Sequence, residues 1–476
     1  MKQMGLTIFS ALLAFLARRF SFLSFLMWIA LVPFFLAISD SKKNYCLVAL
    51  FGFVYYGLSI SWLFSIGELP EFGLTGAVGF LFAFFCWFGL CIYGVVGYMA
   101  LFYVLGKQTW LNGSPVVTAC GFMLLEGIQG WGESPFAFPW CSFAYSQSGV
   151  MMQSSSLLGS AFITFLIVFV NSSFCHAYQK KSIRPLYAAG ILLVANFLFG
   201  AFAMFRMPPG EIGTVSIVQN NIPSDKKWKN IDTISELESF VNRAQGDLIV
   251  FSETVYPAEF TPYIAKKLCK DNAHVMVGAI ETDYEGQRKV AMHMLKNDKV
   301  ATTSYKIHLI PFGEYMPPGF GFLAKYLGLL SFKSGEDVYL HGEGNKKIGS
   351  LICFDSCFSS FAREAVQKGA SLLAVSTNDS WFDGSEEAKQ HMRMSAFRAV
   401  EQGRYMVHAS TTGVTALIDP RGRVLSKLPE KKEGVLEGEI QYIQTRTLFS
   451  YVGDFPLILC LLVLIFEKRR GKNAVS

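Results

Sequence analysis

The chain has 476 residues, of which 52% are hydrophobic, 15% aromatic and only 16% charged. A soluble globular domain usually carries about 25% charged residues, so this composition is typical of a membrane protein. The net charge of +6 is not arranged as a basic stripe interleaved with aromatic residues, so nucleic acid is not an expected partner. Residues 1–206 are strongly apolar, residues 207–450 resemble an ordinary soluble domain, and residues 451–476 turn apolar again before a basic tail.

The apolar runs predict eight membrane spans, seven before the soluble part and one after it. A membrane helix needs roughly 20 apolar residues, so the first and fifth runs are short and the fourth is long. The first run also resembles the apolar part of a signal peptide, although no small-x-small cleavage site follows it. The predicted spans are Met4–Ala17, Ser21–Ser39, Tyr45–Ile66, Leu74–Leu105, Pro115–Gln129, Leu157–Ala177, Leu186–Met204 and Tyr451–Phe466.

The basic residues between these spans predict the orientation of the chain. With the N-terminus inside, eleven lysines and arginines lie on the inner side, and only Arg18 and Arg19 lie on the outer side. Lysine and arginine are enriched on the cytoplasmic side of membrane proteins. We therefore expect residues 207–450 outside the cytoplasm, and residues 451–476 to form the last span and a cytoplasmic tail.

One outer loop, Gly130–Gln147, is unusually rich in aromatic residues, proline and glycine. Aromatic residues often gather at the membrane interface, which is the simpler explanation. The length and rigid composition of the loop also suit the wall of a lipid-facing cavity, in which Phe138, Trp140 and Tyr145 bind substrate. Glu126, in the span before this loop, is the one clear charge inside the predicted spans.

Strand-like and helix-like runs alternate through the soluble part, a pattern typical of an α/β fold in which helices cover sheets. Met316–Phe332 is too apolar for an ordinary exposed loop, so it is either a lid that dips into the membrane surface or a buried loop. The predicted strands are Thr214–Gln219, Asp247–Ser252, His274–Ile280, Val300–Tyr305, Ile348–Ile352, Ser371–Ser376 and Thr412–Ile418. The predicted helices are Thr233–Ala244, Glu259–Lys270, Ser359–Lys368 and Glu386–Gln402.

Three chemically reactive residues each end a strand-like run: Glu253 ends DLIVFSE, Lys306 ends VATTSYK and Cys353 ends IGSLIC. In layered α/β folds the strand ends gather at one edge, where sites form. A carboxylate kept from water can take the thiol proton as a general base. A nearby ammonium favours the thiolate and stabilises an oxyanion, and the thiolate then attacks a carbonyl to form a thioester.

This chemistry needs no histidine and no cofactor. The ten cysteines form no CxxC motif and no ligand-like pairing with the seven histidines, so neither a metal site nor a disulfide framework is predicted. Cys357 is a rival nucleophile one helical turn beyond Cys353, but it lacks the strand-end position.

Four segments resemble the successive motifs of the nitrilase superfamily, namely FSETVYP, YKIHLIPFGEYMP, LICFDSCF and VSTNDSWF. With the flanking spans, the whole chain resembles the bacterial apolipoprotein N-acyltransferase family. The likeness extends from FPWCSFAYSQ in the membrane half to HMRMSAFRAVEQGRYMVHASTTGVTALIDPRG near the end. It implies an α-helical membrane bundle of about eight spans joined to a nitrilase-like αββα sandwich.

The resemblance also implies roles for individual residues. Glu253 would be the general base, Lys306 the oxyanion stabiliser and Cys353 the nucleophile. The implied supporting residues are Glu314, Trp228 near the acyl pocket, Asp355, and Phe354, whose backbone N–H would be a second oxyanion donor. Trp381 and Phe382, in the fourth motif, would bind substrate, although plain core packing also explains them.

The chain departs from the family pattern in two places. Where the family has Cys-Tyr-Glu, this chain has Cys353, Phe354 and Asp355, so a phenol hydroxyl is lost and the carboxylate is one methylene shorter. Ser252 replaces the usual proline before Glu253. Either Asp355 reaches its partner by a shifted backbone or through water, or the role of this acid is less strict than in the family.

The implied activity moves an acyl chain from a phospholipid, usually phosphatidylethanolamine, to the N-terminal α-amino group of a diacylglyceryl apolipoprotein. It would be the last step of lipoprotein maturation, at the periplasmic side of the bacterial inner membrane. Two alternatives stay open. One is a membrane-tethered nitrilase-type amidase, against which the apolar lid argues. The other is a transporter with an external domain, against which the absence of an internal repeat argues.

Overall fold

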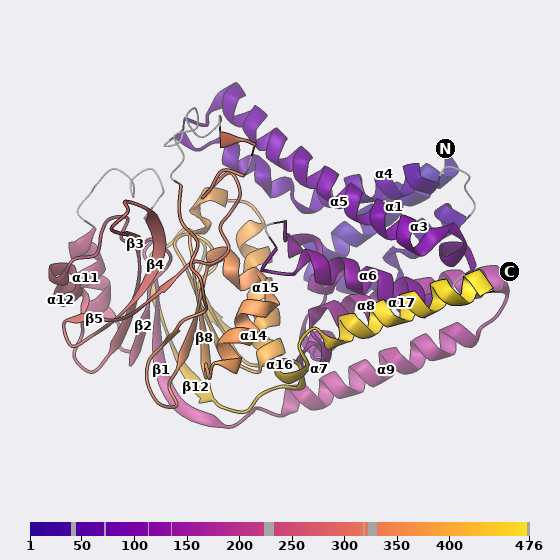
Figure 1. Cartoon of the computed structure of the whole chain (residues 1–476). Coiled ribbons are helices and arrows are strands. Elements are labelled where there is room, and N and C mark those ends of the chain that lie inside the picture. Colours follow the sequence, from indigo (N-terminus) through magenta and orange to yellow (C-terminus); the bar gives the residue numbers. More distant parts are fainter. Residues whose placement is uncertain are drawn as a thin grey trace.

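The computed structural model of the chain shows a helical bundle at one end and a two-sheet sandwich at the other (Figure 1). Both chain ends lie at the end of the bundle that is remote from the sheets. The structure describes residues 1–39, 44–70, 73–112, 114–134, 136–222, 233–317, 319–321 and 331–473.

All eight apolar runs are helical, and the structure thereby confirms several apolar helices in the N-terminal region. Among the described residues, four helices are long and apolar enough to cross a membrane, or five if the bent pair α4 and η2 forms one span. The number of eight spans therefore stays a prediction. The helices are α1 (Lys2–Arg19), η1 (Ser21–Leu26), α2 (Met27–Ala30), α3 (Val32–Ser39), α4 (Asn44–Ser59), η2 (Ser61–Gly67), α5 (Gly76–Asn112), α6 (Pro115–Gln129), α7 (Ser155–Leu158), α8 (Ser160–Lys180), α9 (Arg184–Phe205), α16 (Leu448–Val452) and α17 (Phe455–Asn473).

Glu126, the charged residue of α6, holds the aromatic loop against the bundle. Its carboxylate accepts hydrogen bonds from the Ser142 hydroxyl at 2.6 Å, from the Phe143 backbone N–H at 2.9 Å and from the Thr164 hydroxyl. A buried carboxylate is costly unless hydrogen bonds replace its water. This charge on α6 therefore fixes where the loop turns toward the sheets.

The described strands form two six-stranded sheets, in the orders β12-β1-β2-β3-β4-β5 and β11-β10-β9-β8-β7-β6. Each sheet has parallel strands in the middle and antiparallel strands at its edges. The parallel strands β7 and β8 are buried along their whole length, as expected for strands covered on both faces. The strands are β1 (Gly210–Gln219), β2 (Leu248–Val250), β3 (His274–Thr282), β4 (Arg288–Lys296), β5 (Lys299–Tyr305), β6 (Leu340–His341), β7 (Ile348–Ile352), β8 (Leu372–Thr377), β9 (Met406–Ser410), β10 (Ala416–Ile418), β11 (Val424–Lys427) and β12 (Gly434–Ile443).

Helices cover the outer faces of both sheets, which completes an α/β sandwich. Helices α11 (Ile234–Arg243) and α12 (Pro262–Leu268) lie on the side away from the bundle, and α14 (Ser359–Gln367) and α15 (Glu387–Gln402) lie between the sheets and the bundle (Figure 1). The predicted helices all occur within two or three residues of their expected ends. Of the predicted strands, Thr412–Ile418 is too long, because only Ala416–Ile418 pairs.

Helix α15 joins the two halves of the molecule through buried polar side chains. The Gln390 side-chain oxygen accepts a hydrogen bond from the Trp140 indole at 2.7 Å. Farther along α15, Glu401 accepts the backbone N–H of Ser160 at 2.8 Å, at the start of α8. Arg398 donates to the Cys357 carbonyl at 2.9 Å, on the sandwich side. One helix therefore sets the position of the sheets relative to the bundle.

Gly278 of β3 leaves room for the segment that follows β2. A Cβ at this glycine would lie 2.5 Å from the Ser252 carbonyl oxygen and 2.5 Å from the Thr254 nitrogen, which are backbone atoms that cannot move freely. Overpacking of this kind typically costs about 1–3 kcal/mol.

We expect Gly278→Ala to lower the thermal unfolding midpoint of the detergent-solubilised chain by about 3 °C or more. Gly190→Ala is the control, because nothing lies within 4 Å of its added Cβ, and equal midpoints for both variants would contradict the expectation.

Candidate active site

Lys306 is the centre of a buried charged cluster to which two strand ends and the loop after β5 contribute. Its Nζ lies 2.9 Å from Oε1 of Glu253 and 2.6 Å from Oε1 of Glu314. The lysine side chain is fully buried, and the two glutamate side chains are only 6% and 12% exposed. A buried ammonium is tolerated only with such partners, so each of the three side chains requires the others.

Hydrogen bonds between the two sheets fix the segment that carries Glu253. The Ser376 hydroxyl of β8 donates to the Phe251 carbonyl at 2.9 Å, and the backbone N–H of Asn378 donates to Oε2 of Glu253 at 3.1 Å. Ser252, which stands where the family has proline, accepts a hydrogen bond from the Thr411 hydroxyl at 3.0 Å. The substitution therefore adds a buried polar link between the sheets at the base of the site.

Cys353 lies at the turn between β7 and a short 3-10 helix, Cys353–Cys357, which we call the nucleophile turn. Its backbone φ is +51°, in the left-handed region that residues with a side chain rarely adopt. Such a conformation costs of order 1–3 kcal/mol and persists only when the surroundings impose it. The Ser356 hydroxyl contributes by donating to the Cys353 carbonyl at 2.8 Å.

The charges of the cluster determine which groups carry protons. Burial, followed by the negative charge of Glu253, raises the pKa of the Cys353 thiol well above its usual value, although Lys306 opposes the shift. Burial also raises the pKa of Glu314, against the effect of Lys306. Burial alone would lower the pKa of Lys306, but Cys353 and the two glutamates outweigh it and raise that pKa. The resting site therefore holds an ammonium and a protonated thiol that needs a base.

Asp355 reaches backbone partners without help from water, which answers the question raised by the shorter carboxylate. It accepts hydrogen bonds from the backbone N–H groups of His308 at 2.7 Å, Ile307 at 3.2 Å and Ile352 at 3.4 Å. Burial nevertheless raises the pKa of Asp355 to about 7. The residue ties the segment after Lys306 to the nucleophile turn, and Glu314 stabilises the same segment by accepting from Ile310 N–H at 2.8 Å.

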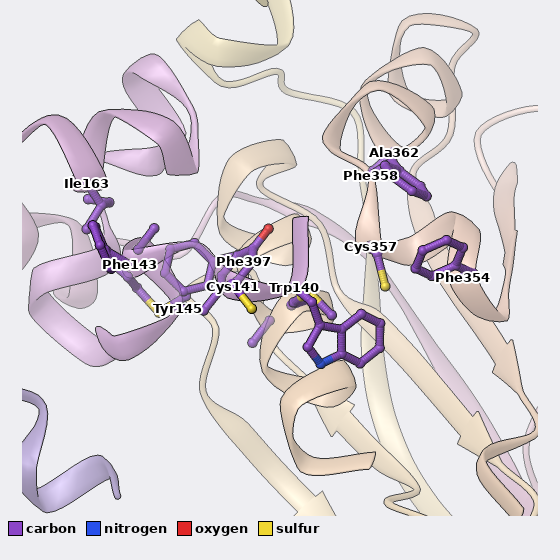
Figure 2. Packing of buried hydrophobic residues seen from close by; sticks show 14 of the residues in the cluster. Trp140, Cys141, Phe143, Tyr145, Ile163, Phe354, Cys357, Phe358, Ala362 and Phe397 are labelled. Atoms are coloured by element: carbon purple, nitrogen blue, oxygen red, sulfur yellow. The ribbon is translucent and has the colours of Figure 1, made fainter. Parts of the chain in front are cut away.

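Aromatic residues from the bundle form one wall beside the nucleophile turn (Figure 2). The Trp140 ring lies 6.1 Å from the Phe354 ring and 6.1 Å from the Phe138 ring. Trp62 of η2 lies 5.2 Å from Trp140 and 4.9 Å from Phe382. The structure thereby brings together three of the aromatic residues predicted to bind substrate, along with Phe354 and Trp62.

The other predicted residues have different outcomes. Tyr145 packs against Phe397 of α15 at 5.1 Å, and Figure 2 shows it on the bundle side of Trp140. Trp381 is half-buried and packs against the main core. Their roles in substrate binding stay predictions. Trp228, and residues 318 and 322–330 of the predicted lid, lie outside the described residues. Phe320, in a described part of that segment, packs against Phe85 of α5 at 6.3 Å.

Two histidines and one tryptophan that the sequence did not assign to the site contact its residues. His308 bonds through Nδ1 to the Gly132 carbonyl of the bundle loop at 2.7 Å, and its ring lies 5.2 Å from Phe354. His391 of α15 lies behind the nucleophile turn, and Trp62 belongs to the aromatic wall. Both histidines were visible in the sequence, but chemistry that needs no imidazole gave no reason to assign them to the site.

Comparison with known proteins agrees with this fold. The model of the apolipoprotein N-acyltransferase N-terminal domain matches residues 10–173, and that of carbon-nitrogen hydrolases matches residues 214–448. An apolipoprotein N-acyltransferase of Gloeobacter violaceus is 29% identical, covering 94% of this chain and 91% of the relative. The Rickettsia prowazekii relative of the same name is 30% identical, covering 72% of this chain and 74% of the relative. An apolipoprotein N-acyltransferase of Methylococcus capsulatus is 29% identical, covering 90% of this chain and 88% of the relative.

The chain joins a carbon-nitrogen hydrolase sandwich to an apolar helical bundle, and the sandwich holds a buried Glu–Lys–Glu cluster beside a cysteine. These features define a membrane-associated enzyme of the nitrilase type. More specifically, the chain belongs to the apolipoprotein N-acyltransferase family. The resemblance noted in the sequence and the prediction of an acyltransferase are thereby confirmed.

The raised pKa of Cys353 predicts how this thiol reacts when no lipid is present. Only the thiolate is alkylated, so a thiol with a pKa above its usual value reacts faster as the pH rises. We expect the rate of Cys353 alkylation by iodoacetamide, followed by peptide mass spectrometry, to increase continuously from pH 6 to about pH 9. A plateau near neutral pH would instead indicate a preformed thiolate paired with Lys306.

Proposed function

We propose that this protein transfers an acyl chain from a membrane phospholipid, through a thioester on Cys353, to the α-amino group of a diacylglyceryl apolipoprotein. The observation that carries the proposal is the fully buried Lys306 ammonium held by Glu253 and Glu314 beside the cysteine, in a chain of this family. The site residues have no metal or cofactor role in this scheme.

In the first half of the reaction, Glu253 takes the proton of the Cys353 thiol, and the thiolate attacks the ester carbonyl of the phospholipid. Lys306 and the backbone N–H of Phe354 stabilise the oxyanion of the tetrahedral intermediate. The bond from carbon to the glyceryl oxygen then breaks, and Glu253 returns its proton to that oxygen. The products are a lysophospholipid and an acyl group held on Cys353 as a thioester.

In the second half, the α-amino group of the apolipoprotein attacks the thioester carbonyl. Glu253 accepts a proton from the nitrogen, the carbon–sulfur bond breaks, and the thiolate regains that proton. The acyl group is then linked to the protein as an amide. Because one product leaves before the second substrate reacts, the kinetics are expected to be ping-pong.

Burial of the site favours transfer over hydrolysis. Cys353 is 9% exposed and Lys306 1% exposed, and the rings of Trp140 and Phe354 pack 6.1 Å apart beside the nucleophile turn. A site that excludes water protects a reactive acyl intermediate. This favours an acyltransferase over the alternative of a membrane-tethered amidase, which must admit water to the thioester.

We propose the same division of the chain that composition predicts: residues 1–206 as the membrane part, 207–450 as the catalytic domain and 451–476 as a last span with its tail. The catalytic domain faces the periplasm of the bacterial inner membrane in this proposal. The positions of both chain ends and of the α8–α9 connection, at the end of the bundle remote from the sheets, support it (Figure 1). The basic residues Lys180, Lys181 and Arg184 lie in or beside that connection.

The central test is the acyl adduct. After incubation of the full chain in detergent with phosphatidylethanolamine vesicles, mass spectrometry is expected to find a long-lived acyl group on the Cys353 peptide. Cys353→Ala should abolish the adduct, whereas Cys269→Ala, which changes a cysteine of the same domain remote from the cluster, should keep it.

Lys306→Met should slow the formation of the acyl adduct by about 10²–10³-fold, as expected for one lost oxyanion donor. An adduct on Cys357, or full activity of Cys353→Ala, would contradict the proposal.

The orientation has its own test in spheroplasts. A cysteine placed at Tyr284, which is 99% exposed in the sandwich, should react with a membrane-impermeant maleimide without lysis. A cysteine placed at Lys181, an exposed residue in the α8–α9 connection, should react only after lysis. The opposite pattern of labelling would place the catalytic domain in the cytoplasm.

A further inference from the structure

A buried imidazole lies directly behind the nucleophile turn. The Nε2 atom of His391, on α15, lies 3.1 Å from the Cys353 carbonyl oxygen and 2.7 Å from the Ser356 hydroxyl oxygen. His391 is 1% exposed, and its ring faces Trp140 of the bundle at 5.9 Å. The reaction proposed for Cys353 gives this histidine no chemical step, so its contacts with the turn need another explanation.

The hydrogen-bond partners of His391 determine where its proton lies. The Ser356 hydroxyl donates its single proton to the Cys353 carbonyl at 2.8 Å. Ser356 therefore accepts from His391, and Nε2 must carry a hydrogen that points at the serine and the carbonyl. The imidazole is thus a donor to the backbone of the nucleophile turn and does not act as a base.

Asp379 orients the imidazole from its other side. One of its carboxylate oxygens lies 3.3 Å from Nδ1 of His391 and accepts the Thr377 hydroxyl at 2.7 Å, while the second accepts the Ser410 hydroxyl at 2.8 Å. Burial would raise the pKa of Asp379, but its hydrogen bond to His391 and nearby charges hold that pKa at about 2. An ionised carboxylate only accepts hydrogen bonds, so both ring nitrogens of His391 face acceptors.

Asp379, His391 and His408 are also close enough together to ligate a metal ion. The protein already supplies hydrogen-bond partners to Nε2 of His391 and to both oxygens of Asp379, whereas the buried Nε2 of His408 has no partner among the described residues. The metal content of the purified chain therefore distinguishes a hydrogen-bonded cluster from a metal site.

We propose that His391 is a positioning residue for Cys353: held by Asp379, its Nε2–H fixes the Cys353 carbonyl and Ser356, and so keeps Cys353 in its left-handed conformation. This inference rests on the proposed thioester chemistry only for its effect on acylation. The positioning of Cys353 affects the reaction of its thiol with any electrophile.

The test compares two substitutions of His391 in the full detergent-solubilised chain. His391→Leu fills similar space but removes the donor, whereas the amide of His391→Gln can present an N–H near the position of Nε2. A 1 Å misplacement of a reacting group can cost about 10²-fold in rate. We expect His391→Leu to slow both iodoacetamide alkylation of Cys353 and acyl-adduct formation from phosphatidylethanolamine vesicles by about 10-fold or more, and His391→Gln to restore most of both rates. His293→Leu, which removes an equally buried imidazole on β4, is the control.

The outcomes distinguish a positioning role of His391 from a general loss of packing, and they do not depend on the proposed acyl transfer. If the parent forms no acyl adduct, the alkylation rates still test the role of His391. Unchanged alkylation in His391→Leu would overturn the inference. Equal losses in His391→Leu, His391→Gln and His293→Leu would also overturn it, because they would report a general loss of packing. Stoichiometric metal in the purified parent, measured by mass spectrometry, would overturn it by making His391 a ligand.

Discussion

The constraint on which the site depends is the burial of the Lys306 ammonium. A charge with no access to water is stable only when opposite charges surround it at hydrogen-bonding distance, and Glu253 and Glu314 meet that condition at 2.9 and 2.6 Å. Glu253 follows β2, Lys306 follows β5, and both are therefore fixed relative to Cys353 after β7. The ion pairs that satisfy the buried lysine therefore also bring together the two residues that we propose as base and oxyanion donor.

The helical bundle packs directly against the candidate site. Trp140, in the loop held by Glu126, packs on Phe354 beside the nucleophile and on the imidazole of His391 behind it. The indole N–H of Trp140 also donates to Gln390 of α15. Loop, helix and nucleophile turn therefore form one packed unit across the boundary between bundle and sandwich. This arrangement fixes the sandwich against the apolar helices of the bundle.

Local patterns predicted an alternating α/β domain and the strand-end positions of Glu253, Lys306 and Cys353, and the family resemblance implied the sandwich. The catalytic roles of the three residues stay predictions. Apolar runs marked the central strands β2 and β7, which Glu253 and Cys353 follow, whereas Lys306 follows the mostly polar edge strand β5. Strands β4, β6, β9, β11 and β12 were not predicted. Of these, β11 and much of β12 are exposed, so their residues do not form apolar runs. Thr412–Thr415 looked strand-like, yet its hydroxyl groups bond within a turn and to Asp383, which keeps these residues out of the ladder.

The contacts that His391 and Thr411 make near the site could not be predicted, because their partners are distant in the sequence. His391 reaches Cys353 across 38 positions, and Thr411 reaches Ser252 across 159. The hydrogen-bond donors of the Asp355 carboxylate could not be located from the sequence either. This carboxylate is one methylene shorter than the family's glutamate, yet the backbone N–H groups of Ile307 and His308 lie within hydrogen-bonding distance of it. The position of a backbone N–H is set by the fold as a whole, so a substitution beside a nucleophile can be judged only once those donors are located.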